Sequence, residues 1–182
     1  MKLWLVRHAT PLVPPGTCYG HLDVAADASA TATAAQALAT ALPAGVRLRA
    51  SPLRRCEQLA LSLQGLRPDL ACTTDARLAE LDFGAWEGLR WDAIAPAAYD
   101  AWTADFAHYR PGGGESLAAL LERVRDALAA ARSGGAEEAW ITHAGVARCV
   151  HWLLQTPAGA WPSASDWSMP APSFGAWQAW EI

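Results

Sequence analysis

The 182-residue chain lacks any apolar run near the roughly 20 residues that a membrane-spanning helix needs. It also lacks a signal-peptide core, because residues 3–6 are the whole apolar stretch before Arg7 and His8. Charged residues make up 18% of the chain and the net charge is -4, which gives no general attraction to nucleic acid or anionic lipid. We therefore expect a cytoplasmic protein whose partners include no membrane and no nucleic acid.

Paired cysteines and several catalytic motifs are missing as well. The cysteines show neither the spacing of a disulfide framework nor that of a zinc site; they are Cys18, Cys56, Cys72 and Cys149. None is followed six residues later by arginine, and the chain has no Gly-x4-Gly-Lys-Ser/Thr loop and no Gly-x-Ser-x-Gly elbow. We expect free thiols and no metal or cofactor, and mechanisms based on cysteine, serine or a bound nucleotide lose their support.

What the chain does contain is enough apolar material for one domain over residues 1–182, since hydrophobic residues make up 52% of it. The patterns predict strands at 2–6, 46–50, 71–74 and 139–142, and helices at 27–42, 51–63, 116–132 and 146–154. Residues 91–110 predict short helices joined by loops, residues 157–172 a loop, and residues 174–180 a last edge strand that suits antiparallel pairing. Strands that alternate with helices indicate an α/β fold, a three-layer α/β/α sandwich with a mostly parallel sheet.

Local signals set the expected helix boundaries. Pro43 ends the alanine-rich helix at 27–42, and Pro52 stands where a first helical turn tolerates a residue without an N–H group. Three glycines at 112–114 break the chain before the helix at 116–132, which carries one apolar face. The same glycines predict extra freedom for a substrate loop.

Imidazole and guanidinium groups gather at one edge of the predicted sheet. His8 and His143 each come directly after a strand, Arg7 precedes His8, and Arg54 and Arg55 lie in the first turn of a helix that follows another strand. The carboxyl ends of parallel strands meet at one edge, where ligands of such folds bind. The start of the helix after His143 adds free backbone N–H groups at that edge. Together these groups suit a phosphoryl group.

The chemistry expected of this arrangement is phosphoryl transfer to histidine. A neutral imidazole can attack phosphorus in line and form a covalent phosphohistidine. Neighbouring guanidinium charges keep the imidazole unprotonated and stabilise charge on the phosphoryl oxygens. A carboxylic acid must then protonate the leaving oxygen and later activate water. Glu80 is the leading candidate, and Asp82 and Glu87 compete with it on chemistry alone.

Five segments, in this order along the chain, resemble the motifs of one family. They are residues 5–10 (LVRHAT), 51–58 (SPLRRCEQ), 78–88 (LAELDFGAWEG), 114–116 (GES) and 142–145 (THAG). Together they resemble the histidine phosphatase superfamily, also called phosphoglycerate mutase-like, over most of the chain. The resemblance implies a phosphoglycerate mutase-like fold and a metal-free phosphomonoesterase in which His8 forms the phosphohistidine. It also implies a clamp of Arg7, Arg55 and His143 around His8, with Glu80 as general acid.

Two segments are similar to the α-ribazole phosphatases within that family, namely residues 15–24 (PGTCYGHLDV) and 81–88 (LDFGAWEG). The similarity implies hydrolysis of α-ribazole 5'-phosphate to α-ribazole and phosphate in cobalamin biosynthesis. It implies substrate contacts at the following residues: Arg7, Thr10, Tyr19, Gly20, Arg55, His143 and Ala144. The expected partner is thus a small-molecule phosphomonoester, and a homodimer is a candidate assembly.

The chain departs from the family pattern next to His8. Ala9 stands in place of the commoner glycine, and Thr10 follows as a hydroxyl donor for phosphate. An asparagine that many relatives carry several residues downstream is absent from the proline-rich loop here, which puts one phosphate contact in doubt.

Aromatic residues and the other histidines have simpler interpretations beside functional ones. Aromatic side chains that flank the expected mouth are candidates to stack on a benzimidazole base, although core packing explains any single one of them; they are Trp86, Trp91, Trp102, Phe106 and Tyr109. His21, His108 and His151 are expected to be structural or to face solvent.

Three other functions stay open at this point. One is a broad-specificity histidine phosphatase. A second is phosphoglycerate mutation, which the short stretch between residues 88 and 114 disfavours. The third is a phosphate-ligand binding protein without catalysis, which the full set of charged site residues argues against.

Overall fold

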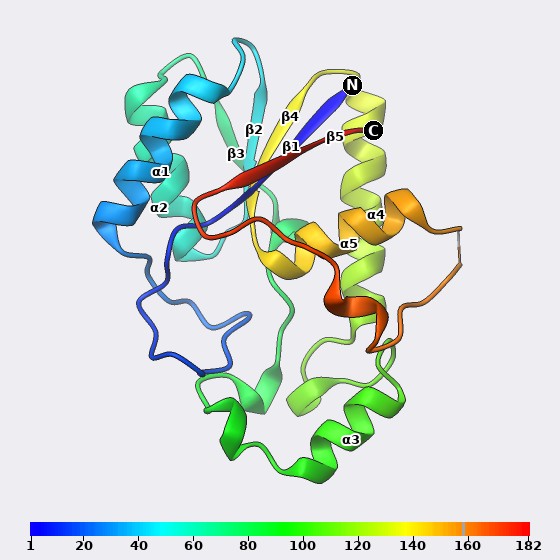
Figure 1. Cartoon of the computed structure of the whole chain (residues 1–182). Helices are drawn as coiled ribbons and strands as arrows, with labels where there is room; N and C mark the ends of the chain where they lie inside the picture. Colours follow the sequence, from blue (N-terminus) through cyan, green and yellow to red (C-terminus); the bar gives the residue numbers. More distant parts are fainter. Residues whose placement is uncertain (158) are drawn as a thin grey trace.

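A five-stranded sheet runs through the computed structural model, which describes residues 1–157 and 159–182 (Figure 1). Its strands are β1 (Lys2–Arg7), β2 (Arg47–Ala50), β3 (Cys72–Thr74), β4 (Glu138–Thr142) and β5 (Trp177–Glu181), in the spatial order β3-β2-β4-β1-β5. The pairs β1–β4, β2–β4 and β2–β3 are parallel, and β5 lies antiparallel to β1 at the edge. The predicted mostly parallel sheet with an antiparallel last strand is confirmed.

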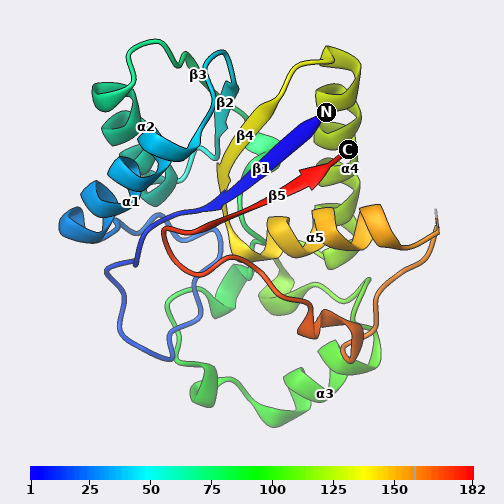
Figure 2. The ribbon, with the colours of Figure 1, turned by 45° about the horizontal axis from the view of Figure 1, so that its top comes forward.

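Two pairs of helices cover the two faces of this sheet (Figures 1 and 2). The helices α1 (Ala28–Ala41) and α2 (Arg54–Leu66) pack on one face, and α4 (Leu117–Gly134) and α5 (Ala144–Gln155) pack on the other. Leu5 and Trp140 are buried with α4 and α5, whereas Val6 and Ile141 are buried with α1 and α2. Because both faces are covered, the central strands are apolar on both sides. The three-layer α/β/α sandwich is confirmed.

A further layer of chain lies beyond the carboxyl ends of the parallel strands (Figures 1 and 2). It contains two short 3-10 helices, η2 (Gly84–Trp86) and η3 (Trp91–Ala93), and the helix α3 (Pro96–Ala104). Its own small core of Cys18, Trp86 and Ile94 is surrounded by half-buried aromatic side chains. The short helices predicted between residues 91 and 110 are thus present, and they cover the sheet edge where the phosphoryl site is expected.

The helix predicted to open at Ser51 and Pro52 begins later, at Arg54. The N–H group of Ser51 donates to the carbonyl oxygen of Ile141 at 2.9 Å, so this residue still continues the pairing of β2 with β4. Pro52 therefore precedes the helix instead of standing in its first turn. α2 also extends beyond the predicted end, to Leu66.

The last strand begins at Trp177, not near residue 174. Gly175, with φ of 73°, turns the chain just before the strand. Its N–H group donates to the carbonyl oxygens of Arg7 and His8, at 3.2 and 3.0 Å. This turn keeps Phe174 out of the sheet and brings it against the end of β1.

The three glycines at 112–114 do not supply the predicted loop freedom. Gly112 and Gly114 pack against residues 82–86, and a Cβ atom on either would overlap the carbonyl oxygen of Phe83 or Asp82, respectively. Gly112 also has a positive φ of 57°. Glycine is required here for close backbone approach, which fixes the segment instead of loosening it.

The remaining predicted loop, at 157–172, contains the short helix η5 (Asp166–Ser168), and its residue 158 lies outside the described residues. Among the helices that the structure describes, none has the length and apolarity to cross a membrane. All four cysteines are free thiols, as predicted.

Candidate active site

His8 stands directly after β1 and is 2% exposed. Its Nδ1 lies 2.7 Å from the carbonyl oxygen of Ala9. A carbonyl can only accept, so Nδ1 carries the proton and Nε2 keeps its lone pair. The backbone N–H of His8 donates to the carbonyl of Thr142 at 3.1 Å, which ties the residue to the end of β4. The ring is thus fixed as a neutral imidazole whose lone pair lies on Nε2.

Arg55, in the first turn of α2, is fully buried beside His8. Its Nε donates to Nε2 of His8 at 3.3 Å, and its Nη1 and Nη2 donate to the carbonyls of Leu22 and Gly20 at 2.9 and 2.5 Å. Burial, and then the charge of Arg55, lower the pKa of His8 to about 3. His8 is therefore neutral at any pH near neutrality.

Arg7 also lines the cavity at His8, and the Phe174 ring packs on its guanidinium. The guanidinium carbon is 3.8 Å from the centre of the Phe174 ring, and Nη1 donates to the carbonyl of Pro172 at 3.2 Å. Its buried Nε has no hydrogen-bond partner among the described residues. Burial lowers the pKa of Arg7, while Tyr19 and Glu80 act in the opposite direction. Arg7 lines the cavity beside His8, where its positive charge would attract a phosphoryl group.

His143 follows β4 and is buried with its ring centre 5.1 Å from that of His8. Its Nε2 lies 2.8 Å from the Ser51 hydroxyl and 3.5 Å from the Cys56 thiol. Burial, and then the charge of Arg55, hold the pKa of His143 well below its ordinary value. The second histidine is thus also neutral and fixed by its neighbours.

Glu80 reaches the same place from the segment after β3, and it is half-buried. Its Oε1 accepts from the N–H of Leu81 at 3.0 Å, and its Oε2 accepts from the N–H of Gly145 at 3.0 Å. Gly145 lies in the first turn of α5, and a Cβ atom there would overlap the Glu80 carboxylate. The glycine at this position therefore allows the carboxylate to sit against the start of α5.

The carboxylate of Glu87, the first competitor for the acid role, is occupied by hydrogen bonds from backbone N–H groups. Its carboxylate accepts hydrogen bonds from four N–H groups, those of Gly20, His21, Leu22 and Phe83. These contacts fix the loop that Arg55 also holds. Glu87 thus has a structural role in shaping the wall of the site.

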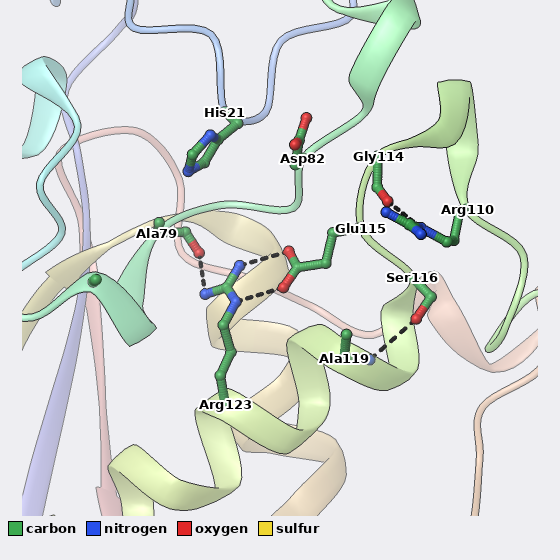
Figure 3. Close-up of a pocket in the computed structure, with 10 residues that line it drawn as sticks. His21, Ala79, Asp82, Arg110, Gly114, Glu115, Ser116, Ala119 and Arg123 are labelled. Atoms are coloured by element: carbon green, nitrogen blue, oxygen red, sulfur yellow. Dashed lines mark hydrogen bonds and ion pairs between the residues drawn. The ribbon is translucent and has the colours of Figure 1, made fainter.

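Asp82, the second competitor, faces elsewhere. Its Oδ1 accepts from the N–H of Gly84 at 2.8 Å, and its side chain lines a separate cavity of about 500 Å³ together with His21 and Arg110 (Figure 3). The structure therefore leaves Glu80 as the one carboxylate of the three that lines the cavity at His8.

Arg123 of α4 holds the segment that carries Glu80 (Figure 3). A guanidinium has five N–H donors, and here each has an acceptor. Two go to the Glu115 carboxylate at 2.7 and 2.8 Å, and three go to the carbonyls of Arg77, Ala79 and Glu80 at 2.7, 2.6 and 3.1 Å. The backbone on both sides of the acid is thereby clamped to α4.

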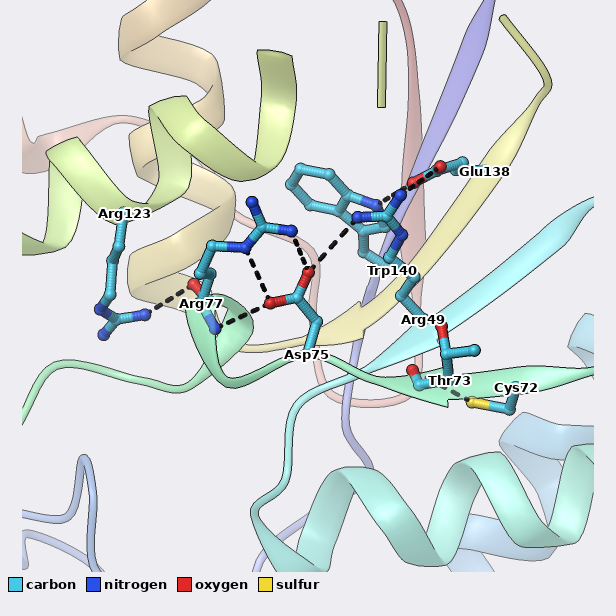
Figure 4. A network of polar contacts seen from close by, with 8 residues as sticks. All are labelled: Arg49, Cys72, Thr73, Asp75, Arg77, Arg123, Glu138 and Trp140. Carbon is cyan, nitrogen blue, oxygen red and sulfur yellow. Dashed lines mark hydrogen bonds and ion pairs between the residues drawn. The ribbon is translucent and has the colours of Figure 1, made fainter. Parts of the chain in front are cut away.

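A second polar network holds the start of the same segment (Figure 4). Asp75, just after β3, accepts from Arg77 at 2.7 Å and from Arg49 of β2 at 3.3 Å. Arg49 also donates to the buried Glu138 at 2.8 Å, which in turn accepts from the indole of Trp140 at 2.8 Å. The acid-bearing segment is thus anchored to β2 and β4 at one end and to α4 at the other.

These side chains surround a cavity of about 340 Å³, which we call the phosphate cavity. It is lined by Arg7, His8, Thr17, Tyr19, Arg55, Glu80, Trp91 and Arg148. The ring of His143 packs against that of His8, Ala144 is the first residue of α5, and the Gly20 carbonyl accepts from Arg55. Most of the predicted site residues are therefore brought together.

Four predicted substrate contacts do not themselves line the phosphate cavity, namely Thr10, Gly20, His143 and Ala144. Thr10 is exposed, and its carbonyl accepts from the N–H of Asp27 at 2.8 Å, so it belongs to the start of α1. Thr17 lines the phosphate cavity instead. The role of Thr10 as a hydroxyl donor to phosphate stays a prediction, and Thr17 is the hydroxyl-bearing residue that lines the cavity with Tyr19.

Three residues of the site were not predicted from the sequence. Arg148 lies one helical turn beyond Ala144 on α5, a spacing that places it on the same face and was the available signal. Thr17 and Phe174 come from loops whose paths are set by tertiary contacts. Thr17 lies in the motif at residues 15–24, which was the available signal, whereas no sequence pattern marks Phe174.

The aromatic residues divide between packing and the site. Trp86 and Tyr109 pack in the cluster around Cys18, whereas Trp91 lines the phosphate cavity, and Trp102 and Phe106 line a neighbouring one. Among the described residues, no three His, Cys, Asp or Glu side chains group as a metal site requires.

Comparison with known proteins identifies a family, two curated relatives and several solved structures that are similar to this chain. The family model described as "Histidine phosphatase superfamily (branch 1)" matches residues 3–165. Two curated relatives, glucosyl-3-phosphoglycerate phosphatases of two Mycobacterium tuberculosis strains (CDC 1551 / Oshkosh and ATCC 25618 / H37Rv), are each 36% identical over 146 residues. The match covers 70% of this chain and spans 65% of the relatives' length.

Solved structures share the fold over almost the whole chain. A mycobacterial glucosyl-3-phosphoglycerate phosphatase aligns over 98% of this chain and 88% of its own, with a TM-score of 0.81 and 25% identity. TTHB049 from Thermus thermophilus aligns over 98% of this chain and 92% of its own, with a TM-score of 0.75 and 30% identity. The phosphoglycerate mutase-like fold expected from the sequence is therefore confirmed.

Proposed function

The chain belongs to the histidine phosphatase superfamily, and from this premise we propose that it hydrolyses phosphomonoesters through a phosphohistidine on His8. One observation carries the proposal above all others. Nδ1 of His8 is bound to a carbonyl and the pKa of the ring is lowered to about 3, so Nε2 is a lone-pair nucleophile at the wall of a cation-lined cavity.

The first half of the proposed reaction transfers the phosphoryl group to the enzyme. Nε2 of His8 attacks phosphorus, a nitrogen–phosphorus bond forms, and the bond from phosphorus to the leaving oxygen breaks. Glu80, in its protonated form, gives its proton to the leaving oxygen, so the product departs as an alcohol. Arg7 and Arg55 stabilise the charge on the other phosphoryl oxygens.

The second half returns the enzyme to its starting state. The Glu80 carboxylate takes a proton from water as the water oxygen attacks phosphorus, and the nitrogen–phosphorus bond breaks. Inorganic phosphate leaves and His8 is again neutral. Both halves use groups that already line one cavity, and no metal enters the scheme.

For the natural substrate we propose α-ribazole 5'-phosphate. The segments 15–24 and 81–88, which resemble the α-ribazole phosphatases, form the wall of the site through Tyr19 and the Glu87 contacts. Trp91 at the phosphate cavity offers an aromatic face to a base. Removal of the phosphate would be a step in cobalamin biosynthesis.

A second substrate, glucosyl-3-phosphoglycerate, is favoured by a different observation. The curated relatives carry that activity in their names, and structures of the mycobacterial enzyme include complexes with inorganic phosphate and with VO3. This substrate has a carboxylate near its phosphate, and Arg148 is a third cation at the phosphate cavity, beside Arg7 and Arg55, that would pair with it.

A substrate panel on the purified protein tests the proposal. α-Ribazole 5'-phosphate should release phosphate without added metal, and much faster than glucosyl-3-phosphoglycerate and unrelated sugar phosphates. A faster rate with glucosyl-3-phosphoglycerate would replace the proposed substrate, and equal rates across the panel would indicate a broad-specificity phosphatase. Interconversion of phosphoglycerates, or the absence of phosphate release from every compound, would contradict the hydrolase itself.

The variant Arg148→Ala tests whether Arg148 binds the carboxylate that only one of the two substrates carries. Loss of a charged hydrogen bond to the carboxylate should raise KM for glucosyl-3-phosphoglycerate about tenfold. The KM for α-ribazole 5'-phosphate, which has no carboxylate, should change much less. An equal effect on both would show that Arg148 acts on the phosphate and not on the leaving group.

A further inference from the structure

A second, smaller cavity adjoins the phosphate cavity. This side cavity has a volume of about 110 Å³, and Tyr19, Glu80 and Arg148 line both cavities. Its other walls are almost wholly apolar: Leu81, Phe83, Trp102, Phe106, Leu117, Leu120, Gly145 and Trp167. The side cavity therefore adjoins the reaction centre at the proposed acid, Glu80.

Four aromatic rings from three separate parts of the chain shape this side cavity. Trp102 of α3 lies between Phe83 and Phe106, at ring distances of 6.0 and 5.4 Å, and Phe106 meets the edge of Trp167 at 6.0 Å. Each ring is held by its neighbours, so the shape is set before a ligand arrives. The polar groups lie at the end shared with the phosphate cavity.

We propose that this side cavity binds a compact apolar group, one ring in size, on the leaving alcohol of the substrate. The inference rests on the proposed function, because the phosphoryl group must occupy the adjoining cavity. In size the side cavity is comparable to an apolar cavity of roughly 150 Å³ that holds one benzene molecule. A hydroxylated sugar ring would leave its hydroxyl groups without partners against these walls.

The position of Glu80 supports a leaving-group site over any other use. The acid that protonates the leaving oxygen must lie within hydrogen-bond reach of it, so the atoms beyond that oxygen continue past Glu80. The side cavity begins at Glu80 and Tyr19. An apolar ring carried close to the leaving oxygen thus has one direct place to go.

Benzyl phosphate and ethyl phosphate test this inference directly. Their alcohols have nearly equal acidity, so the two esters differ mainly in the ring. The protein should hydrolyse benzyl phosphate with a kcat/KM roughly tenfold higher or more, mostly through KM. Equal kcat/KM values for the two esters would overturn the side cavity as a leaving-group site while leaving the hydrolase intact.

Variants of the cavity walls locate the effect. Trp167→Ala should lower the preference for benzyl phosphate several-fold with little change for ethyl phosphate, and Leu120→Phe should do the same by filling the space. Trp161→Ala is the matched control, since this exposed tryptophan of the same segment packs on His108 and lies outside the lining. A preference unchanged in both wall variants, or lowered equally in the control, would contradict the assignment.

Binding of stable analogues separates this inference from the proposed function. 2-Phenylethylphosphonate and propylphosphonate copy the two esters with a carbon in place of the leaving oxygen, and calorimetry can compare their affinities. Tighter binding of the phenyl compound, reduced in Trp167→Ala, would support the side cavity even if neither ester were hydrolysed. Equal affinities would overturn it.

Discussion

Three features of its surroundings determine the reactivity of His8. The Ala9 carbonyl fixes the proton on Nδ1, burial removes the ring from water, and Arg55 adds a positive charge 3.3 Å from Nε2. The last two lower the pKa of His8 to about 3, and the Ala9 contact acts weakly in the opposite direction. The result is a nucleophile that needs no base to activate it at neutral pH.

Glu80 should matter most when the leaving group is a poor one. Glu80→Gln removes the transferable proton, so kcat for an alkyl phosphate should fall by roughly 10²- to 10⁴-fold. p-Nitrophenyl phosphate, whose leaving oxygen hardly needs protonation, should lose far less in the phosphorylation step. Steady-state and single-turnover rates with both substrates measure the difference.

Asp82→Asn is the matched control for that experiment. Asp82 lies two residues away, faces the cavity of about 500 Å³, and its Oδ1 contact with Gly84 is available to an asparagine oxygen. Its kcat should stay close to that of the wild type. A large loss in Asp82→Asn with little loss in Glu80→Gln would reassign the acid.

Among the elements, the start of α5 depends on a glycine. Gly145→Ala would place a Cβ atom onto the Glu80 carboxylate and displace it. We expect kcat to fall at least tenfold, because the acid moves away from the leaving oxygen. The thermal unfolding temperature should change little by comparison, since alanine suits a helical first turn.

Gly65→Ala in α2 is the control for the same substitution. No heavy atom lies within 4 Å of a Cβ built at that glycine in the described structure, and its backbone is helical. It should raise the free energy of unfolding by about 0.5–1 kcal/mol and leave kcat unchanged. If Gly145→Ala retained wild-type kcat, Glu80 would not need its present position.

How far the sequence predicts each element depends on whether its cause is local. The strands and the strand-end residues His8 and His143 follow from short apolar runs and from the parallel topology, and the structure places both at the expected edge. Ser51 misled the helix prediction because a long-range hydrogen bond to Ile141 keeps it extended. Gly112 misled the loop prediction because the close neighbour, Phe83, is distant in sequence.

The site was less completely predictable than the fold. Motif residues could be assigned because each carries its own chemical signature at a strand end or helix start. Thr17, Phe174 and Arg148 enter the site through loop paths and helix rotation, which depend on packing across the whole chain. The choice among Glu80, Asp82 and Glu87 likewise needed the observed directions of the side chains.

Across the whole molecule, two buried neutral histidines make stability depend on pH. His8 has a pKa of about 3 in the folded protein, and the pKa of His143 is also well below normal, whereas both take ordinary values near 6.5 on unfolding. The unfolded chain then binds more protons below pH 6.5. Their contribution is fully present above about pH 6.5 and is lost as the pH falls towards 3.

Denaturant unfolding between pH 7 and 4.5 measures this dependence. Each such histidine should make the free energy of unfolding fall by up to about 1.4 kcal/mol per pH unit below pH 6. His8→Asn removes one of the two groups, so its stability should fall less steeply than that of the wild type. Parallel slopes for the two proteins would show that His8 titrates similarly in the folded and unfolded states.

The central claim is that His8 carries the phosphoryl group, and trapping the phosphoenzyme tests it most directly. Rapid denaturing quench of a turnover reaction in base, followed by digestion and mass spectrometry, should find an acid-labile phosphate on the His8 peptide at up to about one per chain. His8→Ala should show neither this phosphate nor turnover. Undiminished turnover in His8→Ala, or a phosphate on any other residue, would contradict the mechanism.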